Sequence, residues 1–216
     1  MHYILGEYIV ESELAAKSVL MPNKIILDYI SKLSPNYIAL DYGCGKLRHA
    51  IPLANYVQQV IAIDSREQLE KKQRIHNSII APVEYCKENL TILPLDSDGW
   101  RKQKYDFVLC SNVLSAIPDE IVRMNVLSDI ISVLKKVGHL LLSVQYYNSY
   151  YNSYRTRKDA FPYLDGWLVK RRGSNKYDFY AMLNAECLIG MCRKVGFRSF
   201  TVKKIDGSCY ISARIQ

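Results

Sequence analysis

The stretch Ile38-Ala-Leu-Asp41-Tyr-Gly43-Cys-Gly45-Lys46 decides the fold that this sequence predicts. Its first residues are apolar, which is typical of a buried parallel strand. Gly43 and Gly45 then allow a sharp turn and a close approach of the backbone to a ligand. A second apolar stretch, Val60-Ile-Ala-Ile63, ends on Asp64 about 20 residues later, the distance at which a carboxylate accepts hydrogen bonds from a ribose. The pattern predicts a nucleoside-containing cofactor at this turn.

Length and composition restrict the class of protein. The 216 residues carry a net charge of +8, with 49% hydrophobic and 23% charged residues, as is ordinary for a single soluble domain. No apolar run reaches the roughly 18 residues of a membrane span, and the first residues lack the order of a signal peptide, so a cytoplasmic protein is expected. The six cysteines and four histidines are scattered without metal-ligand spacing, so no metal site is predicted.

Strands and helices alternate along the chain from residue 37. Strands are predicted at 37–41, 60–63, 82–86, 106–110 and 139–144, and helices at 47–57, 65–79, 118–138 and 179–195. Two last strands, 197–205 and 209–214, are joined by Asp206-Gly207, a strong hairpin signal. This order predicts an α/β fold with a doubly wound, mostly parallel seven-stranded sheet that closes with a C-terminal antiparallel β-hairpin.

One domain is expected over residues 1–216, with two additions to the alternating core. Residues 1–36 contain two predicted helices, at 11–20 and 23–33, and are expected to form an N-terminal helical cap. Residues 146–178 interrupt the alternation and are expected to form an insertion on the substrate side.

With these elements in place, the sequence resembles the class I S-adenosylmethionine-dependent methyltransferase family. The resemblance covers residues 37–145 and, in topology, 179–216. Leu40-Asp41-Tyr-Gly43-Cys-Gly45 is similar to the first motif of that family, and Ile61-Ala-Ile63-Asp64 is similar to the second. Tyr105-Asp106-Phe-Val-Leu-Cys-Ser-Asn-Val-Leu114 and Leu134-Lys-Lys-Val-Gly138-His-Leu-Leu-Leu142 resemble later motifs. Four matches in chain order imply the Rossmann-like methyltransferase fold.

The resemblance implies S-adenosyl-L-methionine as the cofactor and a set of residues that bind it. Asp41 is expected to interact with the ammonium group of the cofactor, and Asp64 with both ribose hydroxyls. Alignment on Leu93-Pro94 assigns the adenine amino group to Asn89, with Glu88 beside it as an alternative. The implied cofactor-binding residues are Asp41, Gly43, Gly45, Asp64, Ser65, Arg66, Glu88, Asn89, Ser111 and Asn112.

The helix after the glycine turn departs from the family pattern. Leu47 stands where the family has a third glycine, and Pro52 lies within the predicted helix. A glycine at that position permits close packing of helix and strand, and proline is tolerated without penalty only in the first helical turn. We therefore expect a helix that starts late or bends.

The resemblance implies that a methyl group moves from a sulfonium to an acceptor by in-line displacement. Many small-molecule members carry a histidine where this chain has Ala116, so the sequence identifies no general base and no catalytic residue. Tyr146, Tyr147, Arg155 and Arg157 are candidates for acceptor binding, because interleaved aromatic and basic side chains stack bases and neutralise phosphates. The same tyrosines would equally serve a packed insertion. The acceptor is expected to be a small molecule or a nucleic acid. An anionic group on a small acceptor would suit the basic side chains.

Two other functions remain open from the sequence. A non-catalytic S-adenosylmethionine-binding partner subunit would keep the fold without the activity. An NAD-dependent oxidoreductase would share the glycine turn, but its G-x-G-x-x-G/A fingerprint requires glycine or alanine at position 48, where Arg48 stands.

Overall fold

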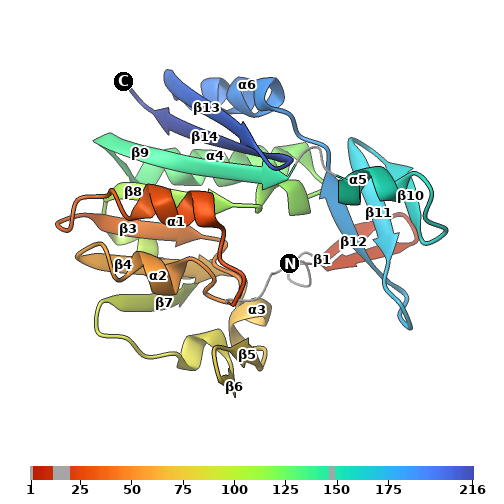
Figure 1. Ribbon diagram of the computed structural model, residues 1–216, viewed down its shortest axis with the longest axis horizontal. Helices are drawn as coiled ribbons and strands as arrows, with labels where there is room; N and C mark the ends of the chain where they lie inside the picture. Colours follow the sequence, from red (N-terminus) through yellow and green to blue (C-terminus); the bar gives the residue numbers. More distant parts are fainter. Residues whose placement is uncertain (1, 12–19, 146–148) are drawn as a thin grey trace. The chain divides into compact units, whose positions relative to one another are not determined.

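A computed structural model describes residues 2–11, 20–145 and 149–216. Seven strands form one hydrogen-bonded sheet in the order β13-β14-β9-β8-β3-β4-β7 (Figure 1). Their bounds are β3 (Ile38–Tyr42), β4 (Gln59–Asp64), β7 (Leu90–Pro94), β8 (Tyr105–Ser111), β9 (Leu134–Gln145), β13 (Ser199–Ile205) and β14 (Ser208–Arg214). β3 pairs in parallel with β4 and β8, and β4 pairs in parallel with β7. The predicted α/β fold with its mostly parallel seven-stranded sheet is confirmed.

The predicted closing hairpin is confirmed as well. β13 and β14 pair antiparallel from Ser199↔Arg214 to Ile205↔Ser208. Between them, Asp206 and Gly207 have φ angles of 49° and 69°. Positive φ at both central residues is the geometry of a type I′ turn, whose twist matches that of the flanking strands.

Six α-helices and three 3₁₀ helices occur among the described residues. They are α1 (Lys24–Ile30), α2 (Ala50–Leu53), α3 (Arg66–Glu70), α4 (Glu120–Val133), α5 (Ser149–Tyr154), α6 (Ala185–Val195), η2 (Pro82–Glu84), η3 (Gly99–Lys102) and η4 (Leu114–Ala116). Asn23 and Asn184 begin α1 and α6, because their side-chain oxygens accept backbone N–H groups of the first turn. Gly196, with φ 118°, ends α6 as predicted.

Contacts within the chain divide it into two compact units. The first comprises the described residues of Met1–Ala15, Ser111–Ser132 and Leu140–Gln216, and the second comprises those of Ala16–Cys110 and Val133–His139. Each unit has apolar side chains that are fully buried, such as Leu168 and Ile211 in the first and Leu40 and Phe107 in the second.

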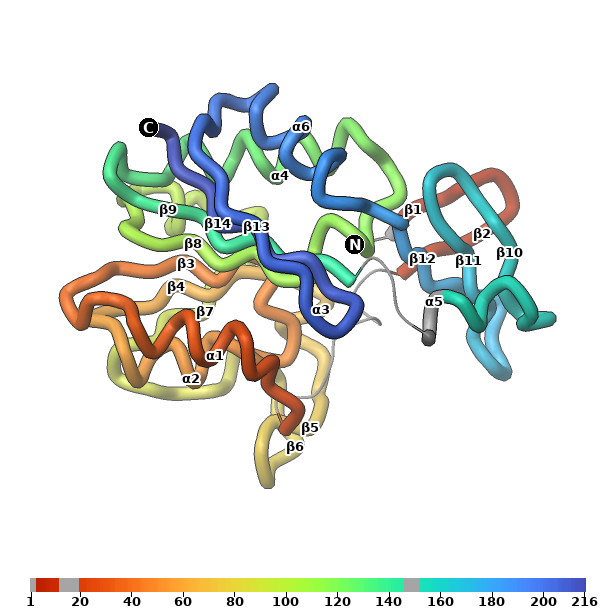
Figure 2. The backbone as a smooth tube through the Cα atoms, turned by 45° about the horizontal axis from the view of Figure 1, so that its top comes forward, coloured from red at the N-terminus to blue at the C-terminus, as the bar shows by residue number. Residues whose placement is uncertain are grey.

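The first unit contains a second sheet that the sequence did not predict. Its five strands have the order β1-β2-β12-β11-β10 (Figure 2). Their bounds are β1 (His2–Leu5), β2 (Tyr8–Glu11), β10 (Ala160–Tyr163), β11 (Gly166–Lys170) and β12 (Lys176–Ala181). The predicted helical cap is therefore wrong for residues 2–11, which form an antiparallel hairpin rich in aromatic and β-branched residues. The helix predicted at 23–33 is present as α1, whereas the one predicted at 11–20 falls largely outside the described residues.

Ring contacts indicate that this five-stranded sheet is strongly curled. Tyr8 on β2 and Phe161 on β10 have β12 and β11 between them, so a flat sheet would separate them by about 14 Å. Their ring centroids are 5.1 Å apart, and the Tyr8 ring also lies 6.0 Å from that of Tyr163 and 5.2 Å from that of Tyr177. These four half-buried rings therefore lie on the concave face of the sheet.

Arg123 links the five-stranded sheet, called the small sheet from here on, to the rest of the first unit. This arginine of α4 is 2% exposed and forms a bidentate ion pair with Asp165, in the turn between β10 and β11. Its Nε also donates to the carbonyl of Ile117 at 2.6 Å. A buried guanidinium with several acceptors is a specific geometric constraint, so Arg123 fixes where the β10–β11 turn lies within this unit.

Two elements predicted between β4 and β8 are wrong. The helix predicted at 65–79 ends at Glu70 and is followed by a hairpin of β5 (Gln73–Ile75) and β6 (Ser78–Ile80). The strand predicted at 82–86 is the turn η2, since Pro82 has no N–H for a strand ladder. The strand is instead β7, which pairs with β4 from Val60↔Leu90 to Asp64↔Pro94.

Two predicted helix boundaries also shift. The helix predicted to end at Gly138 ends at Val133, and Lys135 lies in β9, where its Nζ contacts the Asp106 carboxylate at 2.9 Å. The helix predicted to begin at Phe179 begins at Ala185, because Phe179 belongs to β12.

The predicted late start of the helix after the glycine turn is confirmed. α2 comprises only Ala50–Leu53, so Pro52 falls within its first turn. Leu47 has a φ of 60°, the left-handed conformation that a glycine would adopt, and its side chain is fully buried. The leucine therefore combines backbone strain with apolar packing.

Glycine and alanine variants are expected to have opposite orders of stability at Leu47 and at Leu53. Both side chains are fully buried, but Leu53 has helical backbone geometry. Leu47→Gly should be more stable than Leu47→Ala by about 1 kcal/mol, because glycine removes the cost of the left-handed conformation. Leu53→Gly should be less stable than Leu53→Ala by a similar amount, about 1 kcal/mol. Urea unfolding of the four variants tests this, and the same order at both positions would contradict it.

Candidate functional site

The candidate site lies in the second unit, at the carboxyl edge of its parallel strands. At this edge, β3 leads into the glycine turn of residues 43–45, β4 ends on Asp64, and β7 leads into the loop 95–98. Asp41 is level with Ala62, and Asp64 is level with Pro94. Because parallel strands end at the same edge, the three connections are neighbours, the arrangement in which α/β sheets bind ligands.

The glycine turn is bound to the end of β4. Gly43 and Gly45 have φ angles of 75° and 56°, which permit the tight turn. The N–H groups of Gly43 and Cys44 both donate to the carbonyl of Ile63, at 2.8 and 3.0 Å. The turn thus follows the end of the neighbouring strand closely.

The Asp64 carboxylate is oriented by two backbone donors. Its Oδ2 accepts the N–H of Gly45 and its Oδ1 accepts the N–H of Ser65, both at 2.7 Å. These two hydrogen bonds fix the orientation of the carboxylate at the end of β4. The Ser65 side chain accepts the N–H of Gln68 at 3.3 Å and begins α3.

Asp41 is a buried acid beside a second acid. Its side chain is 2% exposed, and its Oδ2 has no hydrogen-bond partner among the described residues. Burial, with a further contribution from the Asp64 charge, raises the pKa of Asp41 to about 7, although the Ala50 N–H acts in the opposite direction. His49, beside Ala50, is also buried; burial lowers its pKa to about 3, and its Nε2 likewise has no partner in the described part of the chain.

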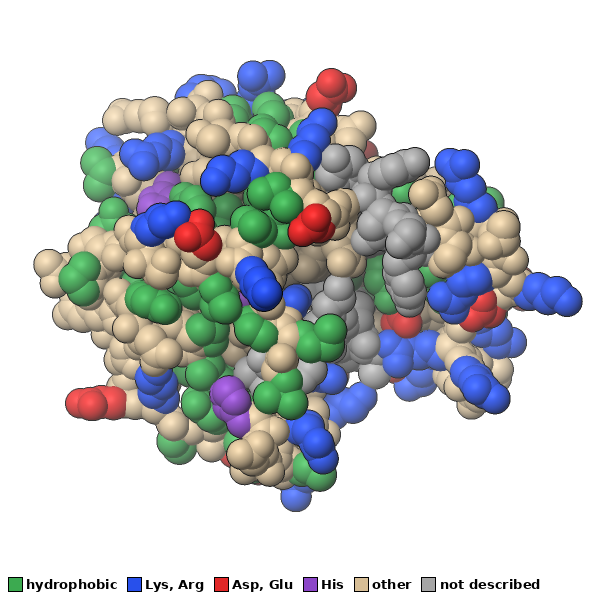
Figure 3. Space-filling model, viewed as in Figure 1, with side chains coloured by type: hydrophobic (Ala, Val, Ile, Leu, Met, Phe, Trp, Pro, Cys, Tyr) green, Lys and Arg blue, Asp and Glu red, His purple; other side chains and the backbone are tan. Residues whose placement is uncertain are grey.

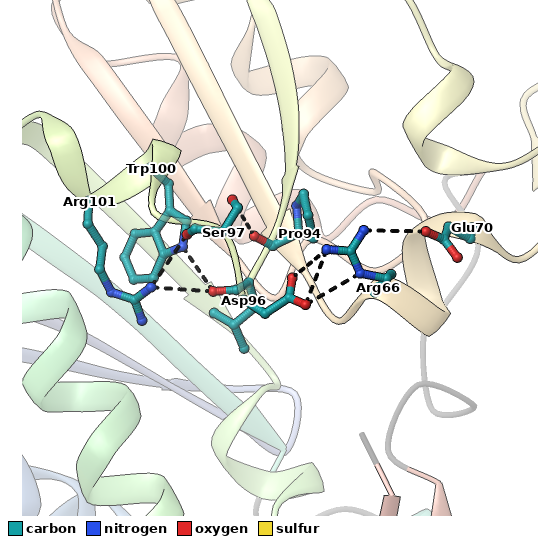
Figure 4. Close-up of polar contacts among 8 residues, drawn as sticks. Arg66, Glu70, Pro94, Asp96, Ser97, Trp100 and Arg101 are labelled. Carbon is teal, nitrogen blue, oxygen red and sulfur yellow. Dashed lines mark hydrogen bonds and ion pairs between the residues drawn. The ribbon is translucent and has the colours of Figure 1, made fainter.

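The loop after β7 brings Asp96 to the same edge. Arg66 donates to Asp96 through Nη2 at 3.1 and 3.2 Å and contacts Glu70 at 3.6 Å (Figure 4). Fully buried Trp100 donates from Nε1 to the carbonyl of Leu95 at 3.1 Å, and this hydrogen bond fixes the start of the loop. The exposed Arg66–Asp96 pair contributes little to folding stability, so Asp96 is available to a ligand at small cost.

Glu88 and Asn89 do not lie with these residues. Both residues precede β7, whereas the candidate site is at the carboxyl end of β7. The position predicted for an adenine contact is therefore at the opposite end of this strand. The Asn89 amide donates to the carbonyls of Ala54 and Val57 at 2.8 and 3.1 Å and holds the connection into β4. The prediction for Glu88 and Asn89 depended on the strand predicted at 82–86, where the structure has the turn η2. Leu90-Thr-Ile-Leu-Pro94-Leu-Asp96 is an apolar stretch that ends on an acid, the same pattern as Ile61–Asp64, and could have identified Asp96.

Ser111 and Asn112 lie where β8 ends, in the first unit. The Ser111 hydroxyl lies 2.9 Å from that of Ser143, and the Asn112 N–H donates to the Ser143 carbonyl at 2.7 Å. Asn112 has a φ of 61°, a strained conformation that is concentrated at functional sites. Asn is among the few residues that tolerate it.

The acceptor residues predicted in the insertion have different outcomes. Tyr146 and Tyr147 lie outside the described residues. Arg157 pairs with Asp159 through Nε at 2.8 Å and lowers the pKa of that carboxyl. Arg155 is exposed, as are Lys158, Lys170 and Arg172. Of these residues, Lys170 belongs to β11, and the others lie outside the strands. Figure 3 shows basic side chains around the part of the surface formed by the five-stranded sheet.

Neither a metal site nor a spanning helix occurs in the described part of the chain. No group of three or more His, Cys, Asp and Glu side chains is placed to hold a metal ion there. No helix within those residues has the length and apolar character needed to cross a membrane.

Comparison with known proteins identifies the family. Residues 21–201 match the family described as "Methyltransferase domain", so the chain belongs to that family. The uncharacterised protein YmfD of Escherichia coli strain K12 is 30% identical over 215 residues, covering 98% of this chain and 95% of YmfD.

Solved structures share the fold. A S-adenosylmethionine-dependent methyltransferase from Methanosarcina mazei superposes with a TM-score of 0.64 at 20% identity, covering 89% of this chain and 98% of that protein. The complex of DhpI with S-adenosylhomocysteine gives a TM-score of 0.62 at 13% identity, covering 87% of this chain and 81% of DhpI. The Rossmann-like methyltransferase architecture of this chain is thereby established.

The stability of the free protein is expected to depend on pH because of the buried Asp41. The folded-state pKa of about 7 lies above the ordinary value of 3.8, so the protonated acid stabilises the fold at low pH. This contribution is complete below about pH 4 and is lost as pH rises through about 7. Asp41→Asn should therefore gain stability relative to wild type between pH 5 and pH 8, by on the order of a few kcal/mol.

Urea unfolding at several pH values measures this difference. Asp98→Asn, which removes an exposed carboxylate of the same unit, is the matched control and should give a difference from wild type that is independent of pH. A constant difference for Asp41→Asn as well would mean that Asp41 is ionised throughout this range.

Proposed function

We propose that this protein is an S-adenosylmethionine-dependent methyltransferase that transfers a methyl group to an acceptor by in-line displacement. The observation that carries the proposal is the Asp64 carboxylate, which the N–H groups of Gly45 and Ser65 hold at the end of β4, beside the glycine turn. The cofactor of the family is S-adenosyl-L-methionine, which brings a methyl group already activated by its sulfonium.

The proposed roles follow the three connections of the sheet edge. Asp64 binds the ribose hydroxyls, and Gly43 and Gly45 allow the backbone to approach the methionine portion of the cofactor. Asp41 faces the ammonium group, because a buried acid with an unpartnered oxygen favours a cationic ligand.

The adenine is proposed to lie between α3 and the loop after β7. Ser65 and Arg66 begin α3, and Asp96 is joined to Arg66 across the edge. Asp96 takes the role of hydrogen-bond acceptor for the adenine amino group, in place of Glu88 or Asn89. A carboxylate accepts hydrogen bonds and donates none, which matches an amino group.

Ser111, Asn112 and the small sheet are proposed to serve the acceptor side. Ser111 is the last residue of β8 and Asn112 follows it; both are proposed to border the reacting methyl group. The insertion 146–178, whose described part contributes β10, β11 and the start of β12, is proposed to bind the acceptor, since exposed Arg155 and its basic neighbours suit an anionic small molecule or a nucleic acid. The protein's contribution to rate is alignment of nucleophile, methyl group and sulfur.

Asp96→Ala is expected to weaken S-adenosylhomocysteine binding about tenfold, because one hydrogen bond to a charged acceptor is lost. Glu88→Ala removes an exposed carboxylate at the other end of β7 and should leave the affinity unchanged. Isothermal titration of both variants tests the assignment. Weakening by Glu88→Ala alone would return the adenine contact to residues 88–89.

Wild-type protein is expected to transfer labelled methyl groups from S-adenosylmethionine to an acceptor in tRNA, rRNA, DNA or a metabolite extract. Asp64→Ala should weaken cofactor binding at least tenfold, since about two charge-assisted hydrogen bonds are lost, and should reduce transfer at limiting cofactor. NAD binding without a response to S-adenosylhomocysteine would contradict the proposal. Binding of S-adenosylhomocysteine without transfer to any pool would indicate a non-catalytic partner subunit.

A further inference from the structure

The buried acid at the end of β3 has surroundings that disfavour its charge in the free protein. Asp41 is 2% exposed, and among the described residues that act on its charge, the Ala50 N–H alone stabilises the ionised form. The charged neighbour that acts on it, Asp64 of β4, carries the same sign. An ionised carboxylate in such a place pays a large desolvation cost without an opposite charge to offset it.

The other ionisable groups beside Asp41 do not supply a compensating charge. The Cys44 thiol in the glycine turn is buried, and burial together with Asp64 and Asp41 raises its pKa well above its ordinary value, so it stays neutral. His49, next to Ala50 at the start of α2, also stays neutral, because burial holds its pKa at about 3. Among the described residues, the charged group that acts on Asp41 is therefore the Asp64 carboxylate, which disfavours its ionisation.

One oxygen of this acid indicates that a ligand binds here. Asp41 Oδ2 is buried and has no hydrogen-bond partner in the described part of the chain, which is rare for a buried polar atom unless a ligand or ion completes it. The acid lies directly before the glycine turn, whose conformation allows close approach of a ligand. A cation arriving there reverses the balance, because an adjacent opposite charge favours the ionised carboxyl.

We propose that the Asp41 carboxyl group carries a proton in the free protein and releases it when the cationic cofactor binds, so that cofactor binding is coupled to proton release. This inference rests on the proposed function. The carboxyl O–H bond breaks, the proton passes to the solvent buffer, and the carboxylate then pairs with the ammonium group of the cofactor. By linkage, acid weakens cofactor binding and cofactor binding acidifies the solution.

Titration calorimetry with S-adenosylhomocysteine tests the coupling in the wild-type chain. The heat of binding is measured in phosphate and in imidazole, which both buffer between pH 6 and pH 8 and whose different ionisation enthalpies give the number of protons released. Close to one proton is expected at pH 6 and close to none at pH 8, because the free acid titrates at a pKa of about 7. As pH is raised, the affinity should increase about tenfold per pH unit up to about pH 7 and level off above it.

Three variants assign the proton to its residue. Asp41→Asn should bind more weakly, with no proton release and no pH dependence of affinity. Asp64→Asn should still release a proton, but at lower pH, because a charge that disfavours ionisation is removed. Glu88→Gln, at an exposed carboxylate of the opposite sheet edge, should match wild type in its proton count.

The possible failures are distinct. Binding of S-adenosylhomocysteine by wild type with equal heats in both buffers at pH 6 and a flat pH profile overturns the proton coupling and leaves the proposed function intact. Proton release that persists in Asp41→Asn overturns the assignment to Asp41. Absence of binding at every pH overturns the proposed function together with this inference. The wild-type measurement needs no variant, so a poorly folded Asp41→Asn protein does not prevent a decision.

Discussion

The hydrogen bond from the Gly45 N–H to the Asp64 carboxylate is the contact on which the candidate site depends. It joins the turn after β3 to the last residue of β4, and the Gly43 and Cys44 N–H groups bind the preceding carbonyl, that of Ile63. Three donors of one turn are therefore satisfied by two consecutive residues of the adjacent strand. The parallel register of β3 and β4 makes this possible, because it brings the turn and the acid to the same edge.

The same edge contains two acids with opposite character. Asp64 accepts two backbone N–H groups at 2.7 Å, an environment that stabilises a carboxylate. Asp41 is buried beneath the turn with an unpartnered oxygen, an environment that stabilises the neutral acid. Two chemically identical side chains thus differ in their preferred charge because of their donors and their burial. That difference suits a ligand that offers hydroxyl groups to one acid and a positive charge to the other.

Leu47 illustrates how the chain departs from its family without losing the turn. The left-handed backbone conformation is kept at φ 60°, and the leucine side chain fills buried space. The cost of the conformation for a non-glycine residue is about 1–2 kcal/mol, which burial of a leucine can offset at about 1.5–3 kcal/mol. The helix that follows is short, and Asp41 accepts the N–H of its first residue, Ala50.

The sequence by itself determined the parallel core, the glycine turn, Asp64 at a strand end, the late helix start and the closing hairpin. These features depend on local patterns: apolar runs, glycines, proline geometry and the Asp206-Gly207 turn. Only the tertiary structure decided that β7 begins at Leu90 and that β2, in the hairpin of residues 2–11, pairs with β12. Strand pairing is set by partners distant in the chain, and short strands with weak alternation of burial leave no local signal of those partners.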